Sequence, residues 1–284
     1  MIMLAKSAAL LSLAAASVPV MGYALSLPFC IKYEKAAFLG LPSHLRGMKI
    51  LHIADLHGRY PHKMHRDIWP VLLNQDFDMA VITGDVILDE ISQLYPHLDG
   101  LRALSRKAPV FYVDGNHEDF CCDEMADLLG KAGIISLYNR RGNFAVGAAG
   151  SSISSVVSVA GFRDYAYLAR RKFKGVTALL DDMADKGSFH LILSHQPQIF
   201  DWFQKGAVPF SALILSGHTH GGQVRLPFFP TLFAPGQGIL PKYGDGWYQR
   251  TDGKVKLFVS RGVGATHFPF RLFNPPEVAV IELV

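Results

Sequence analysis

The chain has 284 residues, of which 50% are hydrophobic and 18% are charged, which predicts a large buried core and excludes global disorder. A formal net charge of +4 is too small to indicate nucleic-acid binding by itself, and it suits an anionic substrate or an anionic membrane surface equally well. Cys30, Cys121 and Cys122 form no disulfide framework, because their number is odd and two are adjacent. We interpret them as packing thiols.

The N-terminal region is apolar. The run from Ser7 to Ile31 contains no charged residue and is long enough to span a bilayer. We favour an uncleaved anchor because the run continues past Ala24, and a cleaved signal peptide with the small-x-small sequence Gly22-Tyr23-Ala24 is the alternative. More Lys and Arg residues follow the run than precede it, which favours a cytoplasmic domain. An uncleaved run would keep the protein associated with the membrane, and cleavage would leave it exported. We therefore expect three parts: an anchor or signal segment over 1–32, a connector over 33–47 and one domain over 48–284.

From Met48 onward, short apolar runs that end in polar residues alternate with segments of helical apolar spacing, which is the α/β pattern. We expect strands over 48–55, 79–85, 109–118, 153–162, 189–195, 211–220, 256–264 and 277–284. Helices are expected over 65–74, 91–108, 122–132 and 174–186. In such folds, binding sites gather beyond the carboxyl ends of the strands.

Five of the expected strand ends carry Asp, His or Asn side chains. One of them alone could be a capping residue or a satisfied core histidine, but five in one chain argue against that reading. Carboxylates, imidazoles and one amide suit a two-metal site that clamps a phosphate and activates water. Asp85, on the middle strand end, is the natural bridging carboxylate, and Asn116 would add an oxygen ligand without further negative charge. The five motifs are Asp55-Leu56-His57, Gly84-Asp85, Gly115-Asn116-His117-Glu118, Ser194-His195 and Gly217-His218-Thr219-His220.

In this order, the motifs resemble those of the calcineurin-like metallophosphoesterases, over roughly residues 48 to 284. The resemblance implies a four-layer α/β sandwich, with two central sheets flanked by helices, here preceded by an N-terminal hydrophobic helix. The second motif departs from the family's GDxxD pattern, since Asp89 comes one place late, and we interpret Asp89 as a loop residue.

The resemblance also implies two bound divalent metal ions, one held by Asp55, His57, Asp85 and His220 and the other by Asp85, Asn116, His195 and His218. A metal-activated water would attack phosphorus in line. His117 would donate a proton or a hydrogen bond to the leaving oxygen, and Glu118 would orient His117. We expect Mn first, because the ligand set is mixed, with Fe, Zn or Mg as alternatives.

The C-terminal third, with GHTHGGQVRLP at 217–227 and VSRGVGATHFPFRLFNPPEVAVIEL at 259–283, resembles the membrane-associated bacterial branch of this family. That branch includes phosphodiesterases and, within it or near it, pyrophosphatases of UDP-2,3-diacylglucosamine, which act in lipid A assembly. The resemblance favours a phosphorylated, lipid-linked small molecule as substrate, with the N-terminal segment in the membrane. The uncharged segment 226–235 is either an apolar lip for acyl chains or the bilayer surface, or a Pro-rich loop packed on the domain.

Three further residues are candidates for substrate binding. Arg225 and Arg271 could contact a phosphate with both guanidinium nitrogens, or could be salt-bridge partners. His267 could reach the substrate from a late loop.

Two other functions remain open. One is a general phosphodiesterase acting on another nucleotide or on a phospholipid-derived substrate. The other is a metal-free scaffold that uses the fold as a binding surface, but it would require lost ligands, and the full set is present. We do not expect nucleic acid, because basic and aromatic residues are not interleaved along a groove-like stretch.

Overall fold

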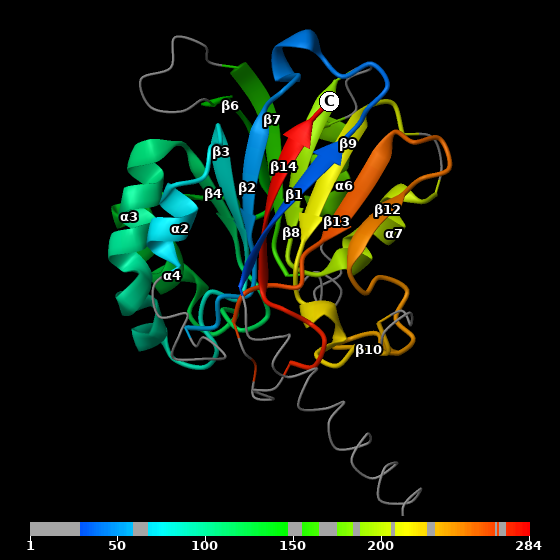
Figure 1. The fold of residues 1–284 in the computed structure, drawn as a ribbon. Coiled ribbons are helices and arrows are strands. Elements are labelled where there is room, and N and C mark those ends of the chain that lie inside the picture. Colours follow the sequence, from blue (N-terminus) through cyan, green and yellow to red (C-terminus); the bar gives the residue numbers. More distant parts are fainter. Residues whose placement is uncertain are drawn as a thin grey trace, which may run out of the picture.

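The computed structural model describes residues 29–58, 68–146, 155–164, 175–183, 188–205, 208–225, 231–264, 266 and 271–284, with no side-chain detail for 175–178. Two six-stranded mixed sheets pack face to face between two layers of helices (Figure 1). This arrangement confirms the expected α/β sandwich. The expected N-terminal hydrophobic helix lies outside the described residues, and among those residues no helix has both the length and the apolar character to cross a bilayer.

The first sheet has the order β1-β14-β2-β3-β4-β5. Its strands β2 to β5 run parallel, β14 is antiparallel to β2, and β1 is parallel to β14. The strands are β1 (Cys30–Ala36), β14 (Glu277–Leu283), β2 (Lys49–Ile53), β3 (Met79–Thr83), β4 (Val110–Val113) and β5 (Ile135–Ser136).

The first sheet includes β1, which lies before residue 48, the expected start of the domain. This strand occupies the end of the expected anchor and the start of the expected connector, yet it pairs with β14 along its whole length, from Cys30 opposite Glu277 to Ala36 opposite Leu283. As an edge strand it is mostly half-buried or exposed, so its side chains lack the strong apolar alternation that reveals an interior strand.

The second sheet has the order β12-β13-β9-β8-β7-β6, with parallel pairing from β13 to β7 and an antiparallel strand at each edge. Its strands are β12 (Gly246–Gln249), β13 (Val255–Val259), β9 (Ser211–Ser216), β8 (Phe189–Ser194), β7 (Ser155–Phe162) and β6 (Arg140–Val146). A separate short hairpin pairs β10 (Phe233–Ala234) with β11 (Gly238–Ile239).

The helices cover the outer faces of the two sheets. The first sheet carries α2 (Trp69–Leu73), α3 (Leu98–Lys107) and α4 (Cys122–Lys131), and the second carries α6 (Gly175–Asp182) and α7 (Phe200–Phe203) (Figure 1). The helix expected over 91–108 is divided: Ile91–His97 is a 3-10 helix that contains Pro96, and the α-helix begins only at Leu98. Proline lacks the backbone donor that an α-helix needs there. Further 3-10 turns are Ser43–Leu45, Pro197–Ile199 and His220–Gly222.

Strand alternation builds a core on each face of each sheet. In β2, Leu51 and Ile53 pack against the helices, whereas Ile50 faces the core between the two sheets, as the two-residue period requires. His52 shares the face of Ile50, is fully buried, and lies 2.8 Å from the hydroxyl oxygen of Thr83 through Nε2. This hydrogen bond and the complete burial of the ring give His52 a structural role.

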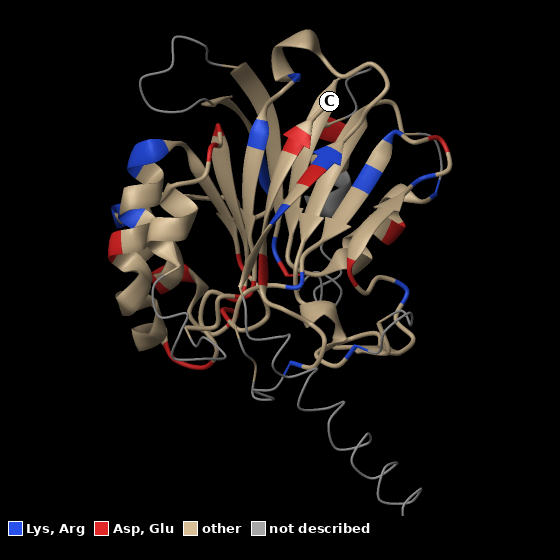
Figure 2. Ribbon diagram, viewed as in Figure 1, with Lys and Arg blue, Asp and Glu red and all other residues tan. Residues whose placement is uncertain are grey.

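The carboxyl ends of β2, β3, β4, β8 and β9 lie at one end of the molecule, the lower end in Figure 1. Acidic residues lie on the loops at this end (Figure 2). The parallel strands of the two mixed sheets end at the same end of the molecule and bring five loops together there, so this end holds the candidate site.

Candidate metal centre

The expected ligands all follow directly on these strands. Asp55 and His57 follow β2, Asp85 follows β3, Asn116 follows β4, His195 follows β8, and His218 and His220 follow β9. All of them except Asn116 are buried. The structure therefore brings together side chains that are up to 165 positions apart in the sequence, as the strand polarity predicted.

Five of these ligands adopt a left-handed backbone conformation. Among the described residues only nine non-glycine residues have a positive φ, and the five are Asp55 (52°), His57 (52°), Asp85 (52°), His218 (72°) and His220 (49°). This conformation costs about 1–2 kcal/mol per residue. Backbone hydrogen bonds hold two of the turns: the Asp55 N–H donates to the Gly84 carbonyl (3.1 Å), and the His57 N–H to the Asp85 carbonyl (2.9 Å). Sharp turns after the strands thus direct the side chains inward.

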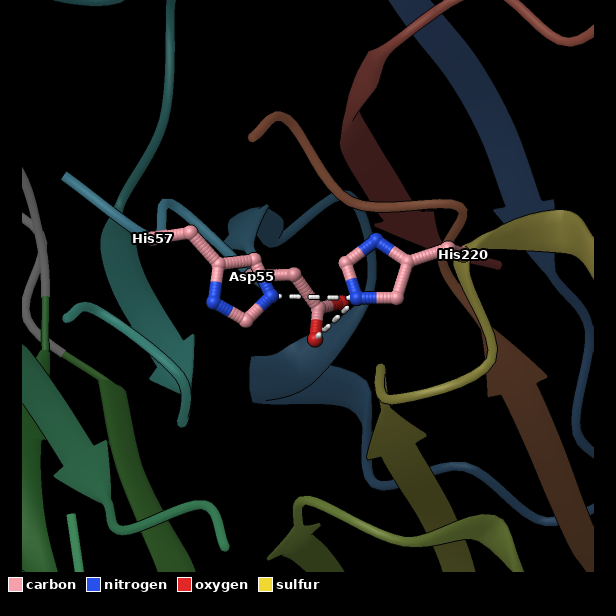
Figure 3. A group of neighbouring side chains, drawn as sticks. All are labelled: Asp55, His57 and His220. Atoms are coloured by element: carbon pink, nitrogen blue, oxygen red, sulfur yellow. Dashed lines mark hydrogen bonds and ion pairs between the residues drawn. The ribbon is translucent and has the colours of Figure 1, made fainter. Parts of the chain in front are cut away.

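The first group consists of Asp55, His57 and His220 (Figure 3). The Nε2 atoms of the two imidazoles are 3.0 Å apart, and Nε2 of His220 lies 3.7 Å from Oδ1 of Asp55. Oδ2 of Asp85 is 3.8 Å from Nε2 of His57. These are the four residues expected to hold one metal ion.

The second group consists of Asp85, His195 and His218. Nε2 of His195 lies 3.2 Å from Oδ2 of Asp85 and 3.1 Å from Nδ1 of His218. Asn116 joins this group through Oδ1, which is 3.2 Å from the same Nε2 atom of His195. Because the same carboxylate oxygen of Asp85 reaches both groups, it occupies the position that a bridging ligand requires.

The donor set fits two metal ions. Burial lowers the pKa of His57 to about 4 and that of His218 to about 3, and it lowers the pKa of His220 well below its ordinary value, so these imidazoles are neutral at pH 7 and offer lone pairs. Burial alone would raise the pKa of Asp85, but the adjacent His195 and His57 lower it well below its usual range. Converging lone pairs beside buried carboxylate oxygens call for cations, and mixed nitrogen and oxygen donors suit Mn, Fe or Zn.

His117 and Glu118 have partners that differ from the expected ones. His117 is half-buried at the rim of the site, with Nε2 3.8 Å from Oδ2 of Asp85. Its Nδ1 atom lies against the carbonyl oxygen of Leu88, which would fix the ring orientation. We expected Glu118 to orient His117, but the carboxylate of Glu118 accepts from backbone N–H groups, and the partner of His117 Nδ1 is the Leu88 carbonyl.

Glu118 instead holds the loop that carries Asp85. Its buried carboxylate accepts hydrogen bonds from the backbone N–H groups of Asp85 (2.9 Å), Gly115 (2.7 Å) and Ile87 (3.1 Å). Burial, followed by repulsion from Asp85, raises the pKa of Glu118 to about 8. In the turn after β4, the side chain of Glu118 is fully buried, whereas that of the neighbouring His117 is half-buried.

Gly115 is needed for the approach of the two loops. A Cβ atom at this position would collide with Oδ1 of Asp85. The glycine of the GNHE motif therefore has a steric role, because any side chain would displace the shared carboxylate.

The substrate-binding candidates Arg225 and Arg271 lie in different environments. Arg225 forms an ion pair with Asp245, which also pairs with Arg261 at 3.2 Å. Arg271 is buried, and it donates to the carbonyl oxygens of Arg261 (2.9 Å) and Gly264 (2.8 Å). Its Nη2 atom lies 3.3 Å from Nδ1 of His220, so this guanidinium stands behind a candidate ligand rather than at the open rim. His267 lies outside the described residues, as do residues 226–230 of the uncharged segment 226–235.

Sequence reasoning missed the residues that support Asp55. The His218 N–H donates to both carboxylate oxygens of Asp55, at 3.0 and 3.1 Å, and the backbone of Gly262 passes so close that a Cβ atom there would lie 2.6 Å from that of Asp55. The two glycines of Gly262-Val263-Gly264, shortly after β13, are the sequence feature that could have indicated this close approach.

Comparisons with known proteins indicate the family. The model of a family described as calcineurin-like phosphoesterase matches residues 48–222. A protein of Bacillus subtilis (strain 168) named uncharacterized metallophosphoesterase YkuE is 29% identical over 252 residues, covering 86% of this chain and 81% of its own length. The phosphodiesterase YaeI of Escherichia coli (strain K12) is 28% identical over 243 residues, covering 83% and 82%. A Danio rerio protein named transmembrane protein with metallophosphoesterase domain is 27% identical, covering 86% of this chain and 54% of its own length.

Proposed function

The chain belongs to the calcineurin-like phosphoesterase family and is a hydrolase, and we propose that it cleaves a phosphodiester or pyrophosphate bond at the two-metal site. One observation carries the proposal: the Asp85 carboxylate lies between two groups of buried ligands, Asp55–His57–His220 and Asp85–His195–His218. Two bound divalent ions would supply a water activated near neutral pH and charge neutralisation at the phosphoryl oxygens.

The residues of the chain divide the remaining work. Asp85 would hold both ions, and Asn116 would contribute an exposed, uncharged oxygen that lets an anionic phosphate approach. Nδ1 of His117 donates to the Leu88 carbonyl, so Nε2 is the nitrogen that faces the site, and the doubly protonated imidazolium form can pass its Nε2 proton to the leaving oxygen. Glu118 would keep the Asp85 loop in place through its backbone hydrogen bonds. A nucleophilic Ser or Cys is not required.

The substrate that we propose is a lipid-linked phosphodiester or pyrophosphate such as UDP-2,3-diacylglucosamine. The C-terminal sequence pattern and the uncharged run at the N-terminus support it. The name of the YaeI relative supports phosphodiester chemistry in general, and that of the zebrafish relative supports an association with membranes. The alternative is another membrane or nucleotide phosphodiester. For the metal, we propose Mn first.

The test is hydrolysis by the purified full chain loaded with Mn, with Asp85→Asn as the inactive variant and Asp99→Asn, an exposed residue of α3, as the matched control. Asp85→Asn should lower metal affinity by about 100-fold or more and abolish turnover, because both ions lose a ligand. Release of UMP and the lipid monophosphate from UDP-2,3-diacylglucosamine would support the full proposal. Cleavage of an aryl phosphodiester alone would keep the chemistry and reject this substrate. If neither is cleaved with both metals verified, the scaffold alternative is favoured.

A further inference from the structure

The hairpin of β10 and β11 turns its apolar side chains outward. Phe233, Ile239 and Leu240 are 51%, 82% and 65% exposed. The polar side chain of the same hairpin points the other way: Gln237 donates to the Tyr243 carbonyl oxygen (2.7 Å) and accepts from the Tyr243 N–H (3.0 Å). Because Tyr243 is buried, these bonds anchor the hairpin to the domain while its apolar side chains face away. The surrounding sequence, 226–241, contains no charged residue, and the exposed Lys242 follows it.

This hairpin adjoins the metal centre. Strand β10 packs against the turn His220–Gly222, which carries a candidate ligand. At the tip of the hairpin, a Cβ atom on Gly236 would lie only 3.6 Å from Nε2 of His218. A surface that meets Phe233, Ile239 and Leu240 would therefore also be close to the mouth of the site.

The first described strand begins at the same end. The Cys30 N–H donates to the Pro276 carbonyl oxygen (3.0 Å), and Cys30 pairs with Glu277, whose carboxylate accepts the Arg261 N–H (3.1 Å). A Cβ atom on the next residue, Gly262, would lie 2.6 Å from Cβ of Asp55. Figure 1 shows β1 starting at the lower end, where the strands of the site finish.

The sequence before β1 limits how the domain can be oriented. Residues 7–28 are 22 uncharged residues, and about 20 apolar residues are enough to span the apolar core of a bilayer. Only Phe29 separates this run from β1, so an inserted run would leave almost no linker between the membrane and the metal-site end of the domain.

We propose that the metal-site end of the domain faces the bilayer and that the β10–β11 hairpin contacts the lipid surface through Phe233, Ile239 and Leu240. Burial of exposed apolar side chains in the headgroup region is favourable. The opposite end, where Leu39 is fully exposed beyond the last residue of β1, would face the aqueous phase. This orientation would give the proposed lipid-linked substrate a direct path to the metals. The experiment that tests the orientation does not depend on measuring turnover.

The experiment places one additional Trp at each end of the full chain. Ile239→Trp reports on the hairpin, and Leu39→Trp is the matched control at the opposite end. Each variant is reconstituted in phosphatidylethanolamine–phosphatidylglycerol vesicles with or without brominated acyl chains, and the emission of the wild type, with Trp69, Trp202 and Trp247, is subtracted. Metal content equal to that of the wild type verifies that each variant is folded.

Bromination should quench the added emission of Ile239→Trp by about half or more and leave that of Leu39→Trp unchanged. Equal emission from Ile239→Trp in both kinds of vesicle would overturn the inference, as would equal quenching at both positions or failure of the chain to bind vesicles. Quenching of Leu39→Trp alone would show that the opposite end faces the membrane. Quenching of Ile239→Trp in a protein that cleaves neither UDP-2,3-diacylglucosamine nor an aryl phosphodiester would support the orientation and reject the proposed function.

Discussion

At the scale of single residues, the neighbours His117 and Glu118 in the turn after β4 have different roles. His117 lies at the rim with Nε2 facing Asp85, whereas Glu118 is buried and binds three backbone N–H groups. One residue can therefore act on the leaving group while the next holds the loop of the shared carboxylate. Two substitutions separate these roles.

His117→Ala should lower kcat by about 100-fold or more, since a positioned general acid contributes about 10²- to 10⁴-fold. The loss should be largest for substrates with poor leaving groups, and metal content should remain that of the wild type. The measurement is kcat for a series of aryl phosphodiesters together with metal analysis, with the exposed His44→Ala as control. Loss of metal from His117→Ala would show that His117 is a ligand.

Glu118→Gln should lower metal affinity by about 10- to 100-fold, because an amide oxygen replaces only part of the carboxylate's acceptor capacity and the Asp85 loop loosens. Metal titration followed by calorimetry measures this, with the exposed Glu124→Gln of α4 as control. If Glu118 acted by orienting His117, the variant would keep its metal affinity and lose turnover only.

At the scale of elements, the loops after β3 and β4 fit together because Gly115 has no side chain. Asp85 closes the loop after β3 with a left-handed backbone, and its carboxylate lies where a Cβ atom of residue 115 would be. The contact between the two loops, rather than either loop alone, sets the position of the shared carboxylate.

Gly115→Ala should therefore reduce metal content and destabilise the protein by about 1–3 kcal/mol, as overpacking does. The matched control is Gly130→Ala in α4, where no described atom lies within 4 Å of the new methyl group. This control should retain both metals and gain about 0.5–1 kcal/mol, because alanine is the better helix former. Denaturant unfolding and metal analysis test both variants, and equal metal content in the two would contradict the steric role.

At the scale of the whole molecule, the two sheets enclose a core that contains a neutral histidine. His52 lies on the inter-sheet face of β2, near the ring of Phe258 on β13 of the other sheet. Burial lowers its pKa to about 3, well below its value of 6.5 when exposed. As the pH falls, His52 is therefore protonated in the unfolded chain at a higher pH than in the folded protein.

The stability that His52 contributes as a neutral group is complete above pH 6.5 and is lost progressively as the pH falls from 6.5 towards 3. Its contribution to the slope of the unfolding free energy approaches about 1.4 kcal/mol per pH unit below pH 6. In His52→Gln, which keeps a polar group for Thr83, the slope between pH 6 and 4 should be smaller by about this amount. Urea unfolding of both proteins across this range is the measurement, and parallel slopes would exclude the contribution of His52.

Much of this protein follows from local patterns in its sequence. The interior strands β2, β3, β4, β8 and β9 are continuous apolar runs because both of their faces are buried, and each ends in a polar residue where the chain leaves the sheet. Parallel strands share the edge at which they end, so the ligand motifs could be assigned to one site before any distance was known.

Contacts between distant segments decided the rest. The edge strand β1 has too weak a pattern to be separated from the apolar run before it, and only pairing with β14 places it in the sheet. The partners of Glu118, Arg225 and Arg271 depend on loops that are folded by long-range packing, and a list of residue types does not contain that information. The sequence by itself identified the candidate metal ligands. The tertiary structure alone determined which side chain supports which ligand, because close contacts such as that of Gly115 with Asp85 join loops that are distant in the sequence.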